Sequence, residues 1–300
     1  MSAELTMPRT GSPRPGRSEP RGASRGRTIA AGIALNTLLV LVALVSVFPL
    51  YWALSTAFLP ADEINGGAQR LFVHQPTLEN FRGLFTATRF FGAMGNSALV
   101  SVVVTVAGTF FAALAGYAFA KLRFRGRNGL FLLMLATLMV PPMVTVPVNF
   151  VLMAKLGLLD TLWAVILPQL TPAFGIFWMR QYALTTVSDQ VLEAARIDGC
   201  GEFRIFWRVV FPMLRPAVAG LGIYLFMASW NQLLLPLTYL QSSDKQTYPV
   251  FLNGLNNSYA VPQHNLAVAA SVLSIIPLLA IFLFGQRHFV RAVTAGAVKE

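Results

Sequence analysis

Charged residues, cysteine and histidine are scarce in this chain of 300 residues, and each shortage excludes a class of protein. Only 12% of the residues are charged whereas 55% are hydrophobic, which leaves too little polar surface to cover a water-soluble domain of this size. The single cysteine, Cys200, cannot form a disulfide within the chain or supply a multi-thiolate metal site. None of the three histidines lies within four residues of another, so a helical two-histidine metal pair is also excluded. The composition predicts a membrane protein without a metal ion or cofactor.

The chain also lacks an energy source of its own. A phosphate-binding P-loop needs Gly-Lys followed by Ser or Thr, yet the four lysines follow Ala, Ala, Asp and Val. Acidic and basic residues fall between the long apolar runs, so no intramembrane proton relay is apparent. No nucleophile, base and orienting acid cluster together either. We therefore expect neither an enzyme nor a proton-coupled carrier.

Long windows without charge indicate the fold class. Six such windows can each hold a transmembrane helix of about 20 residues. None alternates apolar and polar residues as the strands of an outer-membrane barrel do. We expect an all-α, polytopic membrane protein with six transmembrane helices. The expected spans are Ile29–Leu54, Asn96–Phe119, Leu130–Met153, Leu162–Met179, Ala217–Leu240 and Leu266–Gly285.

The basic residues indicate how the chain is oriented. Six spans place both termini on one side, and if that side is the cytoplasm, 18 of the 23 Lys and Arg residues lie inside and five outside. This asymmetry follows the positive-inside rule. We expect a multi-pass protein of the cell's inner membrane with both termini in the cytoplasm. The same distribution accounts for the net charge of +11 without nucleic acid as a partner.

The chain begins with a basic segment, residues 1–28, which contains six Arg and four Pro and almost no apolar bulk. Such a segment cannot bury enough surface to fold, so we expect a disordered cytoplasmic tail followed by one membrane domain, residues 29–300. A cleaved secretory signal is the alternative. The apolar run from Thr28 to Phe58, however, is far longer than the usual signal core of about 7 to 15 residues.

Prolines interrupt the third and fourth spans. They are Pro141, Pro142 and Pro147 in the third, and Pro168 and Pro172 in the fourth. Backbone groups freed by proline at membrane depth must be buried in protein or line a wet cavity. Both packing kinks and a translocation path satisfy this condition. The polar residues that would face such a path, or bond between helices, are Asn149, Gln169, Asn231 and Gln232.

A cytoplasmic segment of about 36 residues, 181–216, joins the fourth and fifth spans and is too long for a simple connector. Its pattern predicts a helix capped by Thr186 or Ser188, a left-handed turn at Gly199, and a second helix that ends at Pro212. An apolar stripe follows one face of the second helix: Phe203, Phe206, Trp207, Val210 and Phe211. Such a helix can lie on the membrane surface or dock in a partner's groove, and a solvated loop is a third interpretation.

The run from Glu193 to Pro216, EAARIDGCGEFRIFWRVVFPMLRP, resembles the EAA loop of membrane subunits from binding-protein-dependent ABC importers. It is similar to the version found in sugar permeases related to the smaller membrane subunit of the maltose importer. Three further runs are similar to segments of this family: FPLYWALSTAF from Phe48, TLENFRGLF from Thr77 and LGLLDTLWAVILP from Leu156. The resemblance covers the chain from about Ile29 to its end.

The resemblance implies that the EAA loop forms a coupling helix seated in a cleft of a cytoplasmic dimer of ABC ATPase subunits. Glu193 would pair with an arginine of the ATPase, and Ala194 and Ala195 would permit close approach. Asp198, which can also be a simple turn residue, and Gly199 would form the joint. The residues expected to connect this joint to the membrane core are Phe203, Phe206, Trp207 and Pro212.

The resemblance further implies a second homologous permease subunit and an extracellular or periplasmic solute-binding protein, received by the outer loops 59–92 and 242–264. The solute would be a sugar or a related compound, and membrane lipid would surround the spans. Gln232 stands where relatives often have an acid, which puts an acid-dependent substrate role in doubt. A self-contained channel or carrier and a membrane-embedded enzyme are the alternative classes.

Overall fold

The computed structural model describes residues 24–67, 71–257 and 263–297, and within these ranges the side chains of 24–31 and 284–297 are left aside. All regular secondary structure in the described ranges is helical, and no strand occurs there. The chain divides into two compact units, residues 1–52 and 53–300. Residues 1–23 of the expected tail lie outside the described residues.

The first unit consists of most of α1 (Ser24–Ala57). This helix begins inside the segment expected to be a tail and contains one proline, Pro49. The stretch Gly32–Ala57 is apolar on all sides, which is typical of a helix surrounded by lipid, and it is long enough to span the bilayer. The first expected span is therefore confirmed as a helix.

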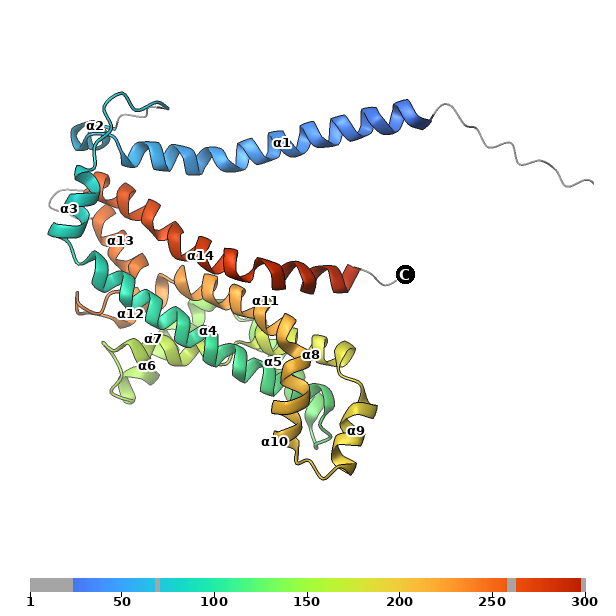
Figure 1. Cartoon of the computed structure of the whole chain (residues 1–300). Coiled ribbons are helices and arrows are strands. Elements are labelled where there is room, and N and C mark those ends of the chain that lie inside the picture. The colour runs from blue at the N-terminus through green and yellow to red at the C-terminus, as the bar shows by residue number, and fades with distance from the viewer. Residues whose placement is uncertain (1–23, 68–70, 258–262, 298–300) are drawn as a thin grey trace, which may run out of the picture. The chain divides into compact units, whose positions relative to one another are not determined.

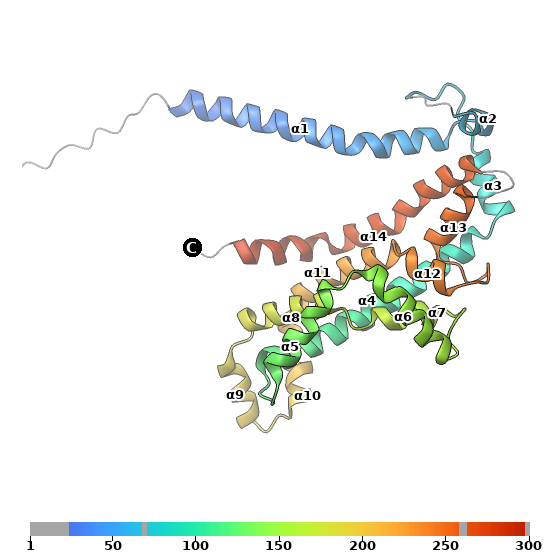
Figure 2. The ribbon, with the colours of Figure 1, turned by 180° about the vertical axis from the view of Figure 1, so that it is seen from behind.

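The second unit is built around α4 (Phe90–Lys121), which packs against α8 (Ala173–Thr186) and α11 (Phe211–Trp230). The helix α14 (His264–Ala297) packs on α11, as Figures 1 and 2 show from opposite sides. Small residues bring the backbones close together. A Cβ atom added at Gly116 in α4 would lie 2.6 Å from Cβ of Met179 in α8. This contact is typical of helix pairs that associate through small residues.

The third expected span is broken. The structure has α5 (Arg127–Ala136), the short 3-10 turn η1 (Thr137–Met139) and α6 (Pro142–Lys155), and the axis bends by 106° between them. The bend lies at Val140 and Pro141, both of which have extended ψ angles, because a residue before proline is driven out of the helical region. Five helices of the described ranges can cross a membrane, or six if this bent pair counts as one span.

The fourth expected span is also interrupted but remains long enough to cross. It consists of α7 (Leu162–Ile166), η2 (Leu167–Gln169) and α8, which together cover Leu162–Thr186.

The fifth expected span, Ala217–Leu240, was wrong at both ends. The helix runs from Glu202 to Trp230 through α10 (Glu202–Ile205), the π turn η3 (Phe206–Val210) and α11. Pro212 therefore does not end the second cytoplasmic helix. It lies in the first turn of α11, directly after the π turn, where a missing N–H and a ring are tolerated. Beyond Trp230 the chain breaks and forms a separate helix, α12 (Leu234–Tyr239).

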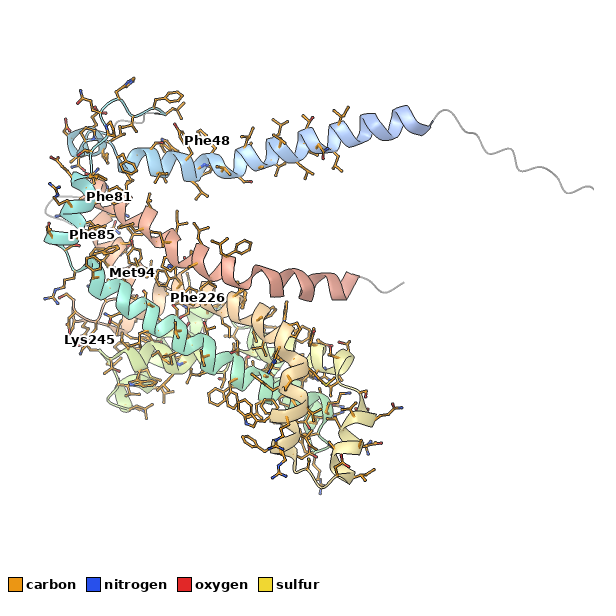
Figure 3. The ribbon with its side chains drawn as sticks, in the orientation of Figure 1. Phe48, Phe81, Phe85, Met94, Phe226 and Lys245 are labelled. Carbon is orange, nitrogen blue, oxygen red and sulfur yellow. The ribbon has the colours of Figure 1, made fainter. Side chains whose placement is uncertain are left out.

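One end of the second unit holds α2 (Ala61–Asn65), α3 (Glu79–Ala87) and α13 (Tyr248–Asn256), and the opposite end holds α9 (Asp189–Ile197) and α10 (Figure 1). Apolar side chains, many of them aromatic, pack the first end, and Phe81, Phe85 and Met94 of this end are labelled in Figure 3. The ring centroids of Phe85 and Phe90 lie 5.3 Å apart.

Two buried or partly buried polar residues fasten this end. The Asn80 amide on α3 donates to the carbonyls of Ala57 and Leu59, at 3.0 and 2.8 Å, and accepts a hydrogen bond from Asn265 on α14. These bonds satisfy carbonyls at the end of α1 that no longer have a helical partner. Asn80 thus ties α3 to the chain segments before and after it.

Asp160 is the second of these residues and has a left-handed φ of +57°. Its carboxylate accepts hydrogen bonds from the N–H groups of Gln241 and Ser242, both at 2.9 Å, and from Nζ of Lys245 at 3.0 Å. The hydrogen bond from the Ser242 hydroxyl, followed by those from the two N–H groups, holds the pKa of Asp160 well below its usual range. The turn before α7 is thereby joined to the loop before α13.

The approach of α4 to α8 gives a test of this packing. In Gly116→Ala the new Cβ would also lie 2.8 Å from the backbone nitrogen of Arg180, so the two helix backbones must separate. We expect the free energy of unfolding to fall by about 1–3 kcal/mol, measured by thermal melting of the detergent-solubilised protein. Gly95→Ala in the same helix is the control, because its Cβ meets nothing within 4 Å. Equal melting temperatures for the two variants would contradict the close contact.

Candidate functional site

The helix α9 has clear start and stop signals. Its N-cap is Ser188, whose Oγ accepts a hydrogen bond from the N–H of Val191 at 3.3 Å. At its other end Gly199 has a left-handed φ of +77°. The N–H of Cys200 donates to the carbonyl of Ala195, and the N–H of Gly199 donates to the carbonyl of Arg196. This is the Schellman pattern of helix termination. The expected cap at Ser188 and left-handed turn at Gly199 are confirmed.

One side of α9 is fixed to the membrane core. Leu192 is buried, and it belongs to the same apolar cluster as Tyr117 on α4 and Phe206 on η3. At the start of α9, Nζ of Lys121 lies 2.8 Å from the carboxylate of Asp189. The hydrogen bond and charge of Lys121 lower the pKa of Asp189. The helix is therefore held by apolar packing and by a charged contact with the end of α4.

The last turn of α9 has a second charged contact. Nε of Arg196 donates to Oε1 of Glu202 at 2.7 Å, across the turn that separates α9 from α10. The other oxygen of Glu202 accepts a hydrogen bond from the hydroxyl of Tyr117 at 2.9 Å. The acceptor is ionised, so both contacts are charge-assisted. Neither Glu202 nor Tyr117 was expected from the sequence to belong to this site.

The opposite side of α9 faces outward. Glu193, Ala194 and Asp198 are exposed, and so is Gly199, whereas Ala195 is half-buried against the core. Asp198 is the C-cap residue of α9. Ile197 is 86% exposed, one helical turn beyond Glu193. Its side chain adds apolar area to the exposed side of α9. Sequence reasoning missed Ile197, although its i, i+4 spacing from Glu193 could have revealed it.

The expected aromatic stripe divides into two parts. Phe206 is buried against Tyr117 and Phe110, and the Trp207 ring stacks on Phe110 with centroids 5.6 Å apart and planes 20° apart. Phe203, by contrast, is 65% exposed and touches only the edge of Trp207 among the aromatic rings described. The stripe thus connects η3 to α4 through Phe206 and Trp207.

The four polar residues considered for a pathway are placed on different elements. Gln169 and Asn231 each donate to the backbone carbonyl four residues earlier, that of Val165 and that of Met227, both at 2.8 Å. Gln232 accepts a hydrogen bond from the N–H of Leu234 at 3.2 Å, and Asn149 is half-buried on α6. Three of the four therefore satisfy nearby backbone, and a pathway role stays a prediction.

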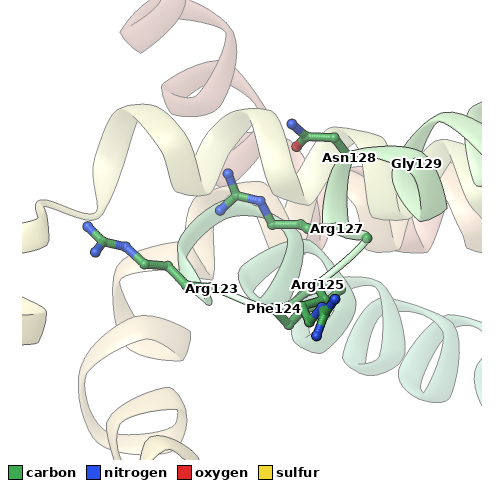
Figure 4. A pocket seen from close by; sticks show the side chains of 7 residues that line it. Arg123, Phe124, Arg125, Arg127, Asn128 and Gly129 are labelled. Carbon is green, nitrogen blue, oxygen red and sulfur yellow. The ribbon is translucent and has the colours of Figure 1, made fainter.

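A basic cleft adjoins α9. It has a volume of about 710 Å³ and lies between the loop that joins α4 to α5 and the face of α9 that carries Glu193 and Arg196. Arg123 and Arg125 belong to this loop and Arg127 begins α5, and all three line a neighbouring cavity of about 560 Å³ (Figure 4). Among the residues with a described placement, no three His, Cys, Asp or Glu side chains lie together so that they could hold a metal ion.

The chain is similar to known transport proteins. A family model described as "Binding-protein-dependent transport system inner membrane component" matches residues 83–295. The arabinooligosaccharides transport system permease protein AraQ of Halalkalibacterium halodurans is 38% identical over 261 residues, which cover 86% of this chain and 93% of that protein. The lactose transport system permease protein LacG of Rhizobium radiobacter is 31% identical over 267 residues, with 89% and 96% covered.

A solved structure has the same fold. It is a chain of a bacterial ABC transporter involved in the import of the acidic polysaccharide alginate, with a TM-score of 0.78 and 24% sequence identity. The match covers 89% of this chain and 99% of that one.

The joint after α9 can be tested at its glycine. Gly199→Ala places a Cβ on a residue with a φ of +77°, which we expect to destabilise the turn by roughly 1 kcal/mol. Gly199→Asn should cost less, because asparagine tolerates this region. Gly201→Ala is the control, since its φ is −70° and its Cβ meets nothing within 4 Å. Thermal melting checks the order, and a Gly201 variant as damaging as Gly199→Ala would contradict it.

Proposed function

Because the chain belongs to the family of binding-protein-dependent transport system inner membrane components, we propose that it imports a carbohydrate together with a second membrane subunit. The chain is a permease subunit of the ABC importer class, a multi-pass inner-membrane component rather than an enzyme. Relatives transport arabinooligosaccharides and lactose, which supports a sugar or oligosaccharide as solute.

We propose that α9 is the coupling helix and docks in a cytoplasmic dimer of ABC ATPase subunits. The observation that carries this proposal is the contrast between the two sides of α9. Leu192 is buried, Asp189 bonds to Lys121 and Arg196 bonds to Glu202, whereas Ile197 and Glu193 are exposed. The salt bridges of the described side chains do not include the Glu193 carboxylate, whose charge acts on Arg196 in the next turn of α9. The exposed carboxylate is therefore available to pair with a basic residue of the ATPase.

The other residues expected at this site have supporting parts in this proposal. Ala194 permits close approach on the exposed side and Ala195 on the core side. Gly199 turns the chain at the Asp198 cap. Phe206 and Trp207 of the aromatic stripe transmit movement of α9 to α4. Phe203 and Pro212 support the loop 181–216.

The opposite end of the second unit suits the solute-binding protein. The loops 59–92 and 242–264 contain α2, α3 and α13, which Asn80 and the contacts of Asp160 fasten in place. We propose that this end faces outside and that both termini are cytoplasmic, so that residues 29–300 form the permease domain and residues 1–28 a cytoplasmic tail. The described residues contain at most six candidate spans, which enclose little polar space, and this supports a homologous second permease subunit as partner.

Reversal of the Glu193 charge tests the docking. In Glu193→Lys the new charge repels a basic partner, so we expect ATPase subunits to be lost on copurification and uptake to fall at least about tenfold. Glu193→Gln should give an intermediate loss. The control is Glu79→Lys, which reverses the charge of an exposed residue on α3, at the end of the second unit opposite to α9. This variant should leave ATPase copurification intact. Normal ATPase binding and uptake in Glu193→Lys would refute the anchor.

Reconstitution separates this proposal from a self-contained channel or carrier. Liposomes with the complete set of permease, ATPase and solute-binding subunits should take up sugar only with ATP. The purified chain alone should take up none, and ATP-independent uptake by it would overturn the assignment.

A further inference from the structure

The turn between α9 and α10 is short and contains two glycines. It consists of residues 198–201, and Gly199 has a left-handed φ of +77°. A glycine backbone permits many orientations at little cost. A force applied to α9 would bend this turn unless a second connection closed it.

Glu202 provides that second connection. It is the first residue of the continuous helix that runs to Trp230, and its Oε1 lies 2.7 Å from Nε of Arg196 in the last turn of α9. Its Oε2 lies 2.9 Å from the hydroxyl of Tyr117, a residue of α4 that is 2% exposed. One carboxylate therefore joins three elements: α9, the α10–α11 helix and α4.

We infer that Glu202 is a positioning residue that transmits movement of α9 to the membrane helices by closing the turn 198–201 against Arg196 and Tyr117. This inference rests on the proposed coupling role of α9. It assigns to Glu202 a task distinct from that of Glu193, since Glu202 bonds to Arg196 and Tyr117 within the chain whereas Glu193 is proposed to pair with the ATPase. The stability of the fold depends little on the pair, because Arg196 and Glu202 are 41% and 46% exposed and such ion pairs contribute weakly to folding.

The test uses the complete transporter in liposomes and measures solute taken up per ATP hydrolysed. Glu202→Gln keeps the shape of the side chain but loses its charge, and we expect this ratio to fall by about three- to fivefold. ATPase copurification and melting temperature should stay as in the unaltered protein, a combination that a merely structural residue would not produce. Arg204→Gln, which removes a charge from an exposed residue of the same helix, is the control and should keep the ratio.

A double-mutant cycle tests whether the three residues act together. Arg196→Gln and Tyr117→Phe should each lower the ratio, and combining either with Glu202→Gln should lower it no further. Arg196→Lys should restore part of the ratio lost in Arg196→Gln. Tyr117→Phe removes only a hydroxyl and so keeps the inference testable if Glu202→Gln folds poorly.

The outcomes separate this inference from the proposed function. Additive effects, or an unchanged ratio in both Glu202→Gln and Tyr117→Phe, would overturn the role of Glu202 while ATPase binding through Glu193 stands. Failure of the unaltered chain to bind any ATPase would overturn the proposed function itself.

Discussion

The close contact between α4 and α8 at Gly116 sets the geometry on which the proposed coupling site depends. Because no side chain separates the backbones there, the next turn of α4 is held at a fixed distance from the core. That turn contains Tyr117 and Lys121, which hold Glu202 and Asp189 respectively. A helix packed less closely would carry both contacts away from α9. The packing of two membrane helices thus determines where a cytoplasmic helix is presented.

Local signals in the sequence were sufficient for much of the fold. Long charge-free windows identified the membrane helices, and Ser188 and Gly199 marked the ends of α9, because capping depends on one or two residues. Pro141 and Pro142 indicate in the sequence that a bend lies between α5 and α6. They do not indicate its angle of 106°, because the angle depends on packing. The continuous helix through Pro212 was missed because a π turn has no simple sequence signal.

The candidate site was predictable in its outward half and not in its inward half. Glu193 and its neighbours belong to a recognisable motif, whereas one partner of Glu202, Tyr117, comes from α4, 85 residues earlier in the chain. A contact over such a sequence separation cannot be inferred from periodicity. The same reason hid Asp160 and its contacts with the loop at Ser242, which are 82 residues apart. Division of α9 into a fixed side and a presented side became evident only when these distant partners were known.

The π turn at Phe206–Val210 has a consequence for how this helix can vary. A π turn accommodates one extra residue, and one residue corresponds to a rotation of about 100° around the axis of an α-helix. The bulge therefore sets the rotational phase of Glu202 relative to α11. Loss of a single residue there would turn the carboxylate away from Tyr117 even though every hydrogen bond of the helix could re-form. Length in this stretch is consequently constrained more tightly than residue identity.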